Sequence, residues 1–529
     1  MQLTQGIHRA VQLHPDQIAL VCADRAIDWA TFADRVARLA GAFRARGVGS
    51  NDRVAMVAGN SDRYVEFYFA TLWAGAVLVP INTRWSRAEM AACIDDCEPG
   101  LLIADTAHLT LALSLRDECG SLREVLLADA PSDSSRRSGV ADWEGLIAGA
   151  DPIADARRSG EDLAALFYTG GTTGRAKGVM LSHANFMANS MMQIANLGLH
   201  EGAVHLHVSP MFHVAGGARL FSVTVAGATH AVLEAFEPDA FLAAIERFRV
   251  TVTVVVPTVL NRLIDHPDLQ RYDLSSLQLL SYGASPMPEA LLKRAMQRLP
   301  GIAFLQSYGM TELSPVATML MPRYHAFEGP DAGYTRSAGQ AVFNADVAIV
   351  DGDDRPLPTG AIGEICVRGP MVMQGYWRQP DKTLEAWRNL WFHTGDLGTR
   401  DHDGNLYFID RIKDAIRRRG ENISSVEVEN EILRHPGVLE CAVIPVSSED
   451  TEQEIMAVIV PHENVQVTAE EIVRFLDGRL AYFMVPRFIE ITSTLPKTET
   501  GKVQKAVLRQ RGLSSAVWDR CAAGIELSR

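Results

Sequence analysis

One stretch constrains this chain more than any other, the run Leu166–Ser182 with the sequence Leu-Phe-Tyr-Thr-Gly-Gly-Thr-Thr-Gly-Arg-Ala-Lys-Gly-Val-Met-Leu-Ser. The apolar lead-in, Leu163–Tyr168, predicts a buried strand. Glycines, threonines and cations then gather in Thr169–Lys177. Glycines let the backbone approach a ligand and turn its N–H groups inward, while hydroxyls add hydrogen bonds and the cations add charge. The combination predicts a loop that binds a polyphosphate.

The loop differs from a Walker A loop, in which a serine or threonine and a helix follow the lysine at once. Here Gly178 follows Lys177, and Val179–Leu181 predicts a second short strand. A helix is expected only after Ser182, a residue type that is favoured as an N-cap. The loop is therefore predicted to join two strands and to close over phosphates as a flap.

The composition excludes several classes of protein. A chain of 529 residues is too long for one core and predicts roughly two to four lobes. The formal net charge of −14 argues against nucleic acid as the main partner, because phosphate backbones favour basic proteins. The sequence has no apolar run of 18 or more residues, so we expect no membrane-spanning helix.

The termini and the cysteines predict a cytoplasmic location. Met1–Arg9 lacks the apolar core of a signal peptide, and Glu526–Arg529 is not a peroxisomal address. The seven cysteines are scattered, and the one close pair, Cys93 and Cys97, has no matching second pair that would suggest zinc. Scattered cysteines in odd number are typical of reduced thiols in the cytosol.

Strands and helices are expected to alternate in the N-terminal region. Trp29–Gly47 has an apolar helical face, Arg53–Ala58 predicts a strand, Asp62–Trp73 a helix and Val77–Pro80 another strand. This alternation predicts an α/β lobe with a largely parallel sheet. Pro131–Gly139, rich in serine and arginine, is expected to be a mobile surface loop.

The same alternation continues through the middle of the chain. The helix after Ser182 should run to about Leu197, and Val204–Pro210 predicts a strand. Val250–Val256 predicts a strand buried on both faces, after which a helix opens at Pro257. Leu279–Pro286 predicts a strand followed by a turn.

The pattern changes twice towards the C-terminus. Beyond residue 340 a small β lobe is expected, with its elements in order: Phe343–Ile349, the turn Asp351–Gly360, Ala361–Arg368, Trp391–Asp396 and the strand Tyr407–Ile409. A compact α+β piece follows, with predicted helices and strands at Val426–Leu433, Leu439–Val446, Ile455–Val460 and Ala469–Leu480.

Five motifs, in this order, resemble the adenylate-forming enzymes, a family that includes acyl-CoA synthetases, peptide-synthetase adenylation domains and luciferases. Thr169–Lys177 resembles the family's phosphate loop, and Tyr308–Glu312 matches its Tyr-Gly-x-Thr-Glu motif without departure. Thr394–Asp396 gives its Thr-Gly-Asp, Asp410–Asp414 its hinge and Pro496–Lys502 its terminal loop. The resemblance covers nearly the whole chain. It implies an α/β fold with a large multi-lobe N-terminal domain, residues 1–410, and a small mobile α+β C-terminal domain, residues 411–529.

The resemblance also implies roles for matching residues. The implied ATP-binding residues lie in these motifs and in the turn at residues 283–285: Thr169, Gly170, Gly171, Thr172, Thr173, Gly174, Lys177, Gly283, Ala284, Ser285, Tyr308, Thr311, Asp396 and Arg411. Catalysis is assigned to Lys502, Thr311 and Glu312, and Lys413 to the hinge. Glu312 would also hold Mg²⁺, which prefers carboxylate and phosphate oxygens.

The implied CoA site contains one departure from the family pattern. Arg419–Ile423 resembles Gly-Gly-Glu-Asn-Ile, with Arg419 in place of the first glycine. An arginine bears strain if that position needs a positive φ. Arg417, Arg418 and Arg419 could instead meet the phosphates of CoA, or form a solvated charged end. The implied CoA-binding residues are Gly420, Glu421 and Arg419.

The carboxylic acid is the least determined substrate. The implied acyl-pocket residues are Phe212, His213, Gly217, Val256 and Gly309. No aspartate occurs in Met211–Gly217, where amino-acid-activating relatives carry one, so an acid without a free α-amine is expected. Small and apolar residues favour a medium- or long-chain fatty acid. Carnitine- and crotonobetaine-type acids and aryl acids such as hydroxycinnamates and benzoate stay open.

These implications predict an AMP-forming acyl-CoA synthetase that uses ATP, CoA and Mg²⁺, and that forms a homodimer as relatives do. Three alternatives stay open: an enzyme that loads a carrier-protein thiol, a non-catalytic nucleotide-binding homologue, and a P-loop phosphotransferase. Activity with free CoA would exclude the carrier-protein enzyme. Pyrophosphate exchange would exclude the non-catalytic homologue, and release of AMP rather than ADP would exclude the phosphotransferase.

Overall fold

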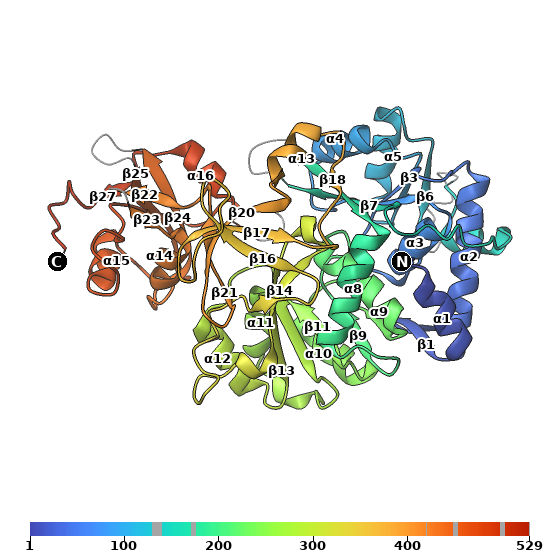
Figure 1. Cartoon of the computed structure of the whole chain (residues 1–529), viewed down its shortest axis with the longest axis horizontal. Coiled ribbons are helices and arrows are strands. Elements are labelled where there is room, and N and C mark those ends of the chain that lie inside the picture. The colour runs from blue at the N-terminus through green and yellow to red at the C-terminus, as the bar shows by residue number, and fades with distance from the viewer. Residues whose placement is uncertain (130–139, 171–175, 419–420, 448–452, 498–502, 528–529) are drawn as a thin grey trace.

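The structure is a computed structural model that describes residues 1–129, 140–170, 176–418, 421–447, 453–497 and 503–527. It has the mixed α/β architecture that the sequence predicts, with a large N-terminal domain and a smaller C-terminal one. In Figure 1 the C-terminal elements, orange to red, form one end of the long axis. None of the helices in the described ranges is both long and apolar enough to cross a bilayer.

The first large sheet has seven strands in the order β18-β8-β7-β4-β3-β5-β6. Its strands are β3 (Arg53–Val57), β4 (Val77–Pro80), β5 (Leu101–Ala104), β6 (Glu124–Leu127), β7 (Leu163–Thr169), β8 (Lys177–Ser182) and β18 (Gly375–Tyr376). Strands β3 to β7 pair in parallel, whereas β8 runs antiparallel to β7. The helices of this region are α1 (Gln5–Leu13), α2 (Trp29–Ala45), α3 (Asp62–Trp73), α4 (Arg87–Cys97), α5 (Leu109–Glu118) and α7 (Trp143–Gly149).

The second large sheet has nine strands in the order β15-β14-β13-β12-β11-β9-β10-β1-β2. Its strands are β1 (Ile18–Cys22), β2 (Arg25–Asp28), β9 (Val204–His207), β10 (Thr229–Val232), β11 (Val252–Val255), β12 (Leu279–Gly283), β13 (Ala303–Gly309), β14 (Val316–Leu320) and β15 (Gln340–Ala341). Its helices are α8 (His183–Leu197), α9 (Val214–Ala226), α10 (Pro238–Phe248), α11 (Pro257–Ile264) and α12 (Glu289–Arg298), with short 3-10 turns η1 (Leu269–Arg271), η2 (Thr311–Leu313) and η3 (Pro322–Tyr324).

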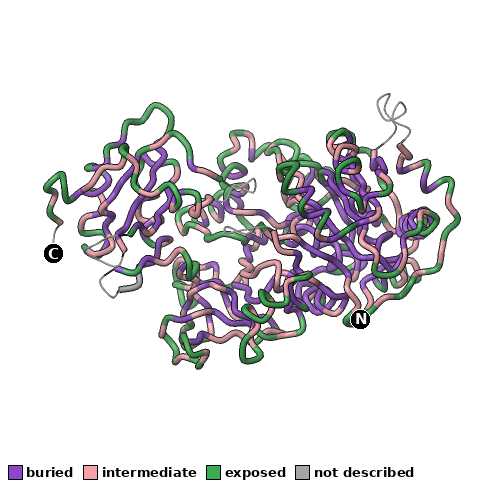
Figure 2. The backbone as a smooth tube through the Cα atoms, turned by 90° about the horizontal axis from the view of Figure 1, so that it is seen from above, coloured by how far each residue is buried: buried purple, intermediate pink, exposed green. Residues whose placement is uncertain are grey.

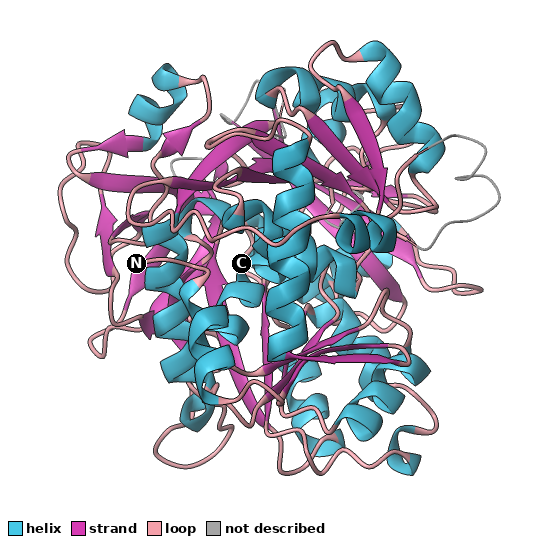
Figure 3. Ribbon diagram, turned by 90° about the vertical axis from the view of Figure 1, so that its right-hand side faces the viewer, coloured by secondary structure: helices cyan, strands magenta, loops and turns pink. Residues whose placement is uncertain are grey.

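The two sheets and their helices form alternating layers. One apolar cluster joins both sheets through α2, α3, α8 and α9, which therefore lie between them. Figure 3 shows helices in the middle of the molecule with strands above and below them. The outer face of the seven-stranded sheet packs on α4 and α5, and that of the nine-stranded sheet on α10, α11 and α12. Figure 2 shows the buried backbone concentrated inside these layers. Burial on both faces explains why strands such as β4 are apolar throughout.

Two smaller units complete the chain. The small β lobe consists of β16 (Asp346–Val350), β17 (Gly363–Arg368), β19 (Trp387–Arg388), β20 (Trp391–Arg400) and β21 (Leu406–Arg411), with α13 (Pro380–Ala386) beside it. The C-terminal unit consists of β22 (Ile416–Arg418), β23 (Glu421–Ile423), α14 (Ser425–Ile432), β24 (Val438–Ser447), β25 (Gln453–Pro461), α15 (Ala469–Leu476), β26 (Phe488–Ile491), α16 (Lys505–Arg511) and β27 (Trp518–Asp519).

Most predicted elements are present, and the errors lie at their ends. The strand predicted from Phe343 begins only at Asp346, and the Phe343 side chain is 80% exposed. The helix predicted to reach Leu480 ends at Leu476, because Asp477 is extended and Gly478 has a φ of +78°. The mobile loop predicted at Pro131–Gly139 lies outside the described residues.

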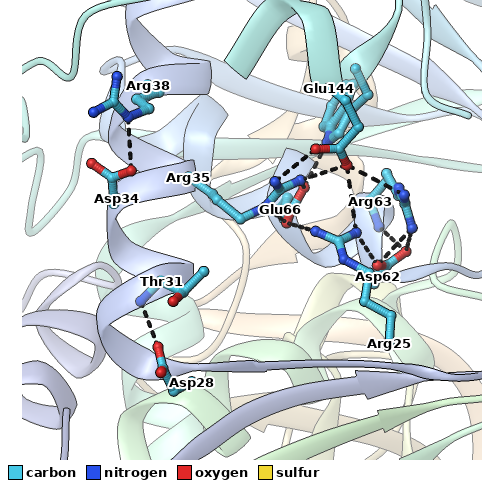
Figure 4. Close-up of polar contacts among 11 residues, drawn as sticks. Arg25, Asp28, Thr31, Asp34, Arg35, Arg38, Asp62, Arg63, Glu66 and Glu144 are labelled. Carbon is cyan, nitrogen blue, oxygen red and sulfur yellow. Dashed lines mark hydrogen bonds and ion pairs between the residues drawn. The ribbon is translucent and has the colours of Figure 1, made fainter. Parts of the chain in front are cut away.

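A buried ion network ties the N-terminal elements together (Figure 4). Its acidic centre is Glu66 on α3, whose side chain is fully buried. Glu66 accepts from Arg35 Nε on α2 at 2.6 Å and from the indole N–H of Trp143 on α7 at 2.6 Å. Its other members are Arg25, Asp62, Arg63 and Glu144. The network fixes α2, α3 and α7 against one another and is balanced, with three arginines and three carboxylates.

Candidate active site

The predicted phosphate loop joins two paired strands, as expected. Thr169, the last residue of β7, lies opposite Lys177, the first of β8, and Ser182 caps α8 through a hydrogen bond from the N–H of Asn185. Gly170 is exposed at the end of β7. The remaining predicted loop residues lie outside the described ranges: Gly171, Thr172, Thr173 and Gly174.

Tyr376 on the edge strand β18 connects this loop to the predicted metal ligand. Its hydroxyl donates to Glu312 Oε1 at 2.9 Å, and the Lys177 ammonium lies 4.6 Å from its ring centroid. Burial, followed by the charge of Glu312, raises the pKa of Tyr376, so the hydroxyl remains a donor. The Met373 N–H donates to the Glu312 carbonyl at 2.8 Å, which fixes the backbone of η2. Glu312, Tyr376 and Lys177 therefore form one group, although they lie far apart in sequence.

A second group forms around Asp396, whose side chain is buried on β20. The Tyr308 hydroxyl donates to Asp396 Oδ2 at 2.7 Å, and Arg411 Nε lies 2.8 Å from Oδ1. The register of β20 and β21 places Asp396 opposite Arg411. Burial, followed by the charge of Asp396, raises the pKa of Tyr308. Three residues from separate sequence motifs thus meet at one carboxylate.

The turn at residues 283–285, which is predicted to bind ATP, follows β12 at the carboxyl edge of the nine-stranded sheet. Gly283 ends β12, and Ala284 and Ser285 are exposed beyond it. Ala284 has a φ of +66°, a conformation that is uncommon for a residue with a side chain. Thr311 opens η2 after the neighbouring strand β13. Carboxyl ends of parallel strands are where open α/β sheets bind ligands.

The segment after β21 leads into the C-terminal unit. Lys413, the predicted hinge residue, is exposed, and Asp414 pairs with Arg509 of α16. Asp410 Oδ2 accepts from the N–H of Ser425 at 2.7 Å. These contacts join the predicted hinge to the helices on its C-terminal side.

The structure describes only part of the predicted CoA site. Glu421 begins β23 opposite Arg418. Arg419 and Gly420 lie outside the described residues, as does the predicted catalytic Lys502.

The predicted acyl residues lie in three places: Phe212, His213 and Gly217 at the start of α9, Val256 before α11, and Gly309 at the end of β13. His213 is the N-cap of α9, and its ring centroid lies 4.6 Å from that of the buried Phe212. Val256 is half-buried at the N-cap of α11. The small size of Gly217 does not create room for a ligand, because a Cβ there would lie 2.1 Å from the Tyr68 hydroxyl. At Gly309 a Cβ would lie 1.8 Å from the Pro315 carbonyl. Both glycines serve close packing.

A separate cluster has the residue types of a metal site. Among the described residues, ligand-type atoms of Glu364, Cys366 and His393 lie within 4.8 Å of one another. The guanidinium of Arg388 lies 2.9 Å from His393 Nδ1, and Glu364 Oε2 lies 2.8 Å from the same nitrogen. An arginine within the cluster supplies the positive charge, so we interpret it as a polar cluster of the small β lobe. Glu312 is not among its members.

Sequence reasoning missed Tyr376. The signal was weak because Gly375–Tyr376 is a two-residue strand, and its pairing with β8 is long-range. The sequence from Tyr376 to Arg378 contains no recognisable motif. The hydroxyl orients Glu312, so the residue belongs to the candidate site.

Replacing Tyr376 by phenylalanine tests this role. The ring beneath Lys177 is kept, but Glu312 loses a hydrogen bond worth about 1–1.5 kcal/mol. We expect kcat/KM for MgATP to fall about 5–12-fold, measured at several Mg²⁺ concentrations. Tyr376→Leu, which also removes the ring, should cost more. Equal kinetics for the phenylalanine variant and the unaltered protein would show that the hydroxyl has no part in ATP use.

Comparisons with known proteins agree with this geometry. The family model described as AMP-binding enzyme matches residues 7–377, and the model of the AMP-binding enzyme C-terminal domain matches residues 427–502. A feruloyl-CoA synthase of Amycolatopsis sp is 37% identical over 95% of this chain and 97% of its own length. A medium-chain fatty-acid–CoA ligase of Escherichia coli is 32% identical over 96% of this chain and 90% of its own.

The fold comparison gives the same result. The crystal structure of ATP-bound MatB from Rhodopseudomonas palustris superposes with a TM-score of 0.86 at 31% identity, covering 97% of this chain and 99% of that one. Three observations therefore point to one family. The family models cover most of the chain, and the relatives match over nearly their full length. The motif residues also meet at Glu312 and Asp396. The chain therefore belongs to the AMP-binding, adenylate-forming enzymes and is an AMP-forming acid–thiol ligase.

Proposed function

We propose that this ligase activates an aryl carboxylic acid, of the hydroxycinnamate type, first to its acyl-adenylate and then to its CoA thioester. The convergence of Tyr308, Asp396 and Arg411 beside the Glu312–Tyr376–Lys177 group carries the nucleotide part of this proposal. The similarity to a feruloyl-CoA synthase along 95% of the chain supports the aryl acid.

The described residues suit the binding of MgATP. Asp396 would accept from the ribose hydroxyls, with Tyr308 and Arg411 holding its carboxylate in place. Lys177 would neutralise phosphate charge. Glu312 offers a hard carboxylate oxygen oriented by Tyr376, and one carboxylate plus phosphate oxygens is a common way of holding Mg²⁺. When bound, Mg²⁺ would neutralise the charge of the phosphates.

The first step would be an in-line displacement at the α-phosphate by the carboxylate of the acid, with pyrophosphate leaving. Positioning and charge neutralisation supply most of the catalysis in such reactions. Thr311 would donate to the α-phosphate, and Lys502 would stabilise charge between the carboxylate and the phosphate. Both roles rest on the family resemblance of their motifs.

The second step would use a different face of the C-terminal domain. We propose that residues 411–529 rotate about Lys413, so that Lys502 leaves and Gly420, Glu421 and Arg419 approach the pantetheine of CoA. The CoA thiol then attacks the acyl carbonyl and AMP leaves. A cytoplasmic location and a homodimer are further proposals from the sequence.

A fatty acid is the second candidate substrate. The Escherichia coli relative named as a medium-chain fatty-acid–CoA ligase is 32% identical over 96% of the chain. Apolar residues such as Phe212 and Val256 near the start of α9 and α11 suit an alkyl chain as well as a ring.

A substrate panel separates the two candidates. We expect kcat/KM for AMP release to be at least about tenfold higher with ferulate or 4-hydroxycinnamate than with octanoate or palmitate, because pocket discrimination is typically about 10–200-fold. Benzoate, acetate and carnitine complete the panel. A clear preference for octanoate or palmitate would replace the aryl acid by the fatty acid.

A further inference from the structure

The nine-stranded sheet has one face that α8 and α9 cover, and its residues can be followed by register. His205 of β9 lies beside Val252 of β11, and Val254 lies beside Ser281 of β12. On the next strand, Ser307 of β13 lies beside Gly283. Partners in parallel register share a face, and side chains alternate along each strand. His205, Val254, Ser281 and Ser307 therefore point to the side where α8 and α9 pack.

This face contains polar atoms that have no hydrogen-bond partner among the residues the structure describes. Within the described residues, His205 Nδ1 and Nε2, Ser281 Oγ and Ser307 Oγ are buried without a hydrogen bond. The same holds for Nε of Arg219, which lies on α9 and is only 4% exposed. Buried polar groups are nearly always paired in native proteins, so four such residues around one face indicate a missing partner.

Arg219 gives the strongest evidence that a partner is missing from this face. Its Nη1 donates to Gln193 Oε1 at 2.6 Å, but no described carboxylate lies within ion-pair distance of its guanidinium. A buried cation is usually paired with an anion or another strong acceptor. Burial lowers the pKa of Arg219 to about 10, which still leaves it charged at neutral pH. The guanidinium therefore has Gln193 as an acceptor, but among the described residues it has no anion and its Nε has no hydrogen-bond partner.

His205 lies close to this cation. Burial, and then the charge of Arg219, lower the pKa of His205 well below its ordinary value. The ring is therefore neutral at neutral pH, with one nitrogen that donates and one that accepts. A ligand oxygen between the two side chains can accept a hydrogen bond from the guanidinium of Arg219. The same oxygen can also form a hydrogen bond with the ring of His205, as acceptor or, if it is a hydroxyl, as donor.

The carboxyl edge of this face is open to solvent. Val254 lies in the interior of the sheet yet is half-buried, as are Val256 and Ser307 nearer the edge. Arg219 lies six residues beyond His213, the N-cap of α9. That separation is about 9 Å along a helix axis, comparable to the length of an aryl acid with a para substituent.

We propose that Arg219 and His205 bind an oxygen at the far end of the acid, so that the substrate class is an aryl acid bearing a distal hydroxyl or carboxylate rather than an unsubstituted one. This inference rests on the proposed function. Ser281 and Ser307 lie on the same face and would complete the polar surroundings of the ligand. An apolar terminus placed there would leave Nε of Arg219 and the ring nitrogens of His205 without hydrogen bonds.

Matched acids that differ only at the far end test the proposal: cinnamate, 4-methylcinnamate, 4-hydroxycinnamate and 4-carboxycinnamate. We expect kcat/KM to be about 10–100-fold higher for the oxygen-bearing acids than for 4-methylcinnamate, because an unpaired polar site rejects an analogue that lacks the hydrogen bond. Whichever of 4-hydroxycinnamate and 4-carboxycinnamate has the higher kcat/KM shows whether the site prefers a neutral or an anionic oxygen. Calorimetric binding of the same acids in the presence of AMP gives the preference independently of turnover.

Variants test whether the preference for an oxygen-bearing acid depends on Arg219. In Arg219→Met the ratio between 4-hydroxy- and 4-methylcinnamate should fall to within about twofold, and Arg219→Lys should restore part of it. Thr224→Val, on the same helix as Arg219, is the matched control, because it removes the buried hydrogen bond between Thr224 and His230 of β10 and should keep the ratio. If Arg219→Met misfolds, the proposal is tested by the kcat/KM ratios of the unaltered protein and by His205→Phe, in which the ratio between 4-hydroxy- and 4-methylcinnamate should also fall.

Two outcomes would overturn the inference. One is equal binding and turnover of all the acids by the unaltered protein, and the other is an undiminished preference in folded Arg219→Met. The proposed function fails separately, if no acid of the panel gives CoA-dependent AMP. In that event the calorimetric preference still tests the site around Arg219.

Discussion

Replacing Lys502 by alanine should slow acyl-adenylate formation by about 10²–10³-fold, equivalent to roughly 3–4 kcal/mol of lost transition-state stabilisation. Lys502 matches the lysine of the family's terminal loop. In that role, its ammonium bridges the substrate carboxylate and the α-phosphate while charge develops between them. Thioester formation from supplied acyl-AMP should be largely spared, because the domain would have turned Lys502 away. Pyrophosphate exchange measures the first half-reaction, and CoA-dependent consumption of acyl-AMP the second.

Lys497→Ala provides the matched control for this experiment. Lys497 is the second residue of the same loop and pairs with the partly exposed Glu440, an interaction of small energetic value. Both half-reactions should be nearly unchanged in this variant. Equal loss of both half-reactions in Lys502→Ala would contradict the use of two faces of the C-terminal domain.

Replacing Glu66 by alanine should lower the free energy of unfolding of the N-terminal lobes by about 3–5 kcal/mol. The change leaves Arg35 without its buried anion and the Trp143 indole without its acceptor. Both groups are held by 2.6 Å contacts, and the Arg35 side chain is only 12% exposed. Urea unfolding followed by tryptophan fluorescence measures the loss, with Trp143 itself as a reporter.

Arg87→Ala serves as the matched control for the stability experiment. The pair Arg87–Glu118 has a short contact of 2.5 Å, but both side chains are about half exposed. Its removal should change the urea midpoint little, since exposed ion pairs contribute little. A shift no larger in Glu66→Ala than in Arg87→Ala would mean that the network of Figure 4 does not hold these helices together.

Sequence reasoning located elements best where periodicity and capping agreed. The helix after Ser182 has an apolar face, a serine cap and an αL glycine at Gly198, and it was predicted to within a residue. Strand ends were less certain, because pairing in three dimensions decides them. The Thr-Gly-Asp motif, for example, lies inside the ten-residue strand β20 rather than at its end.

The site could be predicted only where motif residues carried the chemistry. The sequence alone named Tyr308, Asp396 and Arg411 separately, and the pairing of β20 with β21 brings the last two together. Tyr376 and Arg219 have no local pattern, because their importance arises from long-range contacts and burial. Gly217 has a packing role that the sequence does not show, because a Cβ there would lie 2.1 Å from the Tyr68 hydroxyl.

The most direct test of the account follows the products of ATP in the presence of 4-hydroxycinnamate or ferulate, with and without free CoA. We expect AMP and pyrophosphate in equal amounts, with AMP release and thioester formation both dependent on CoA. Pyrophosphate exchange without CoA-dependent turnover would point to a carrier-protein acceptor instead. Release of ADP, or no turnover of any acid in the panel, would contradict the central claim that this chain is an AMP-forming aryl-acid–CoA ligase.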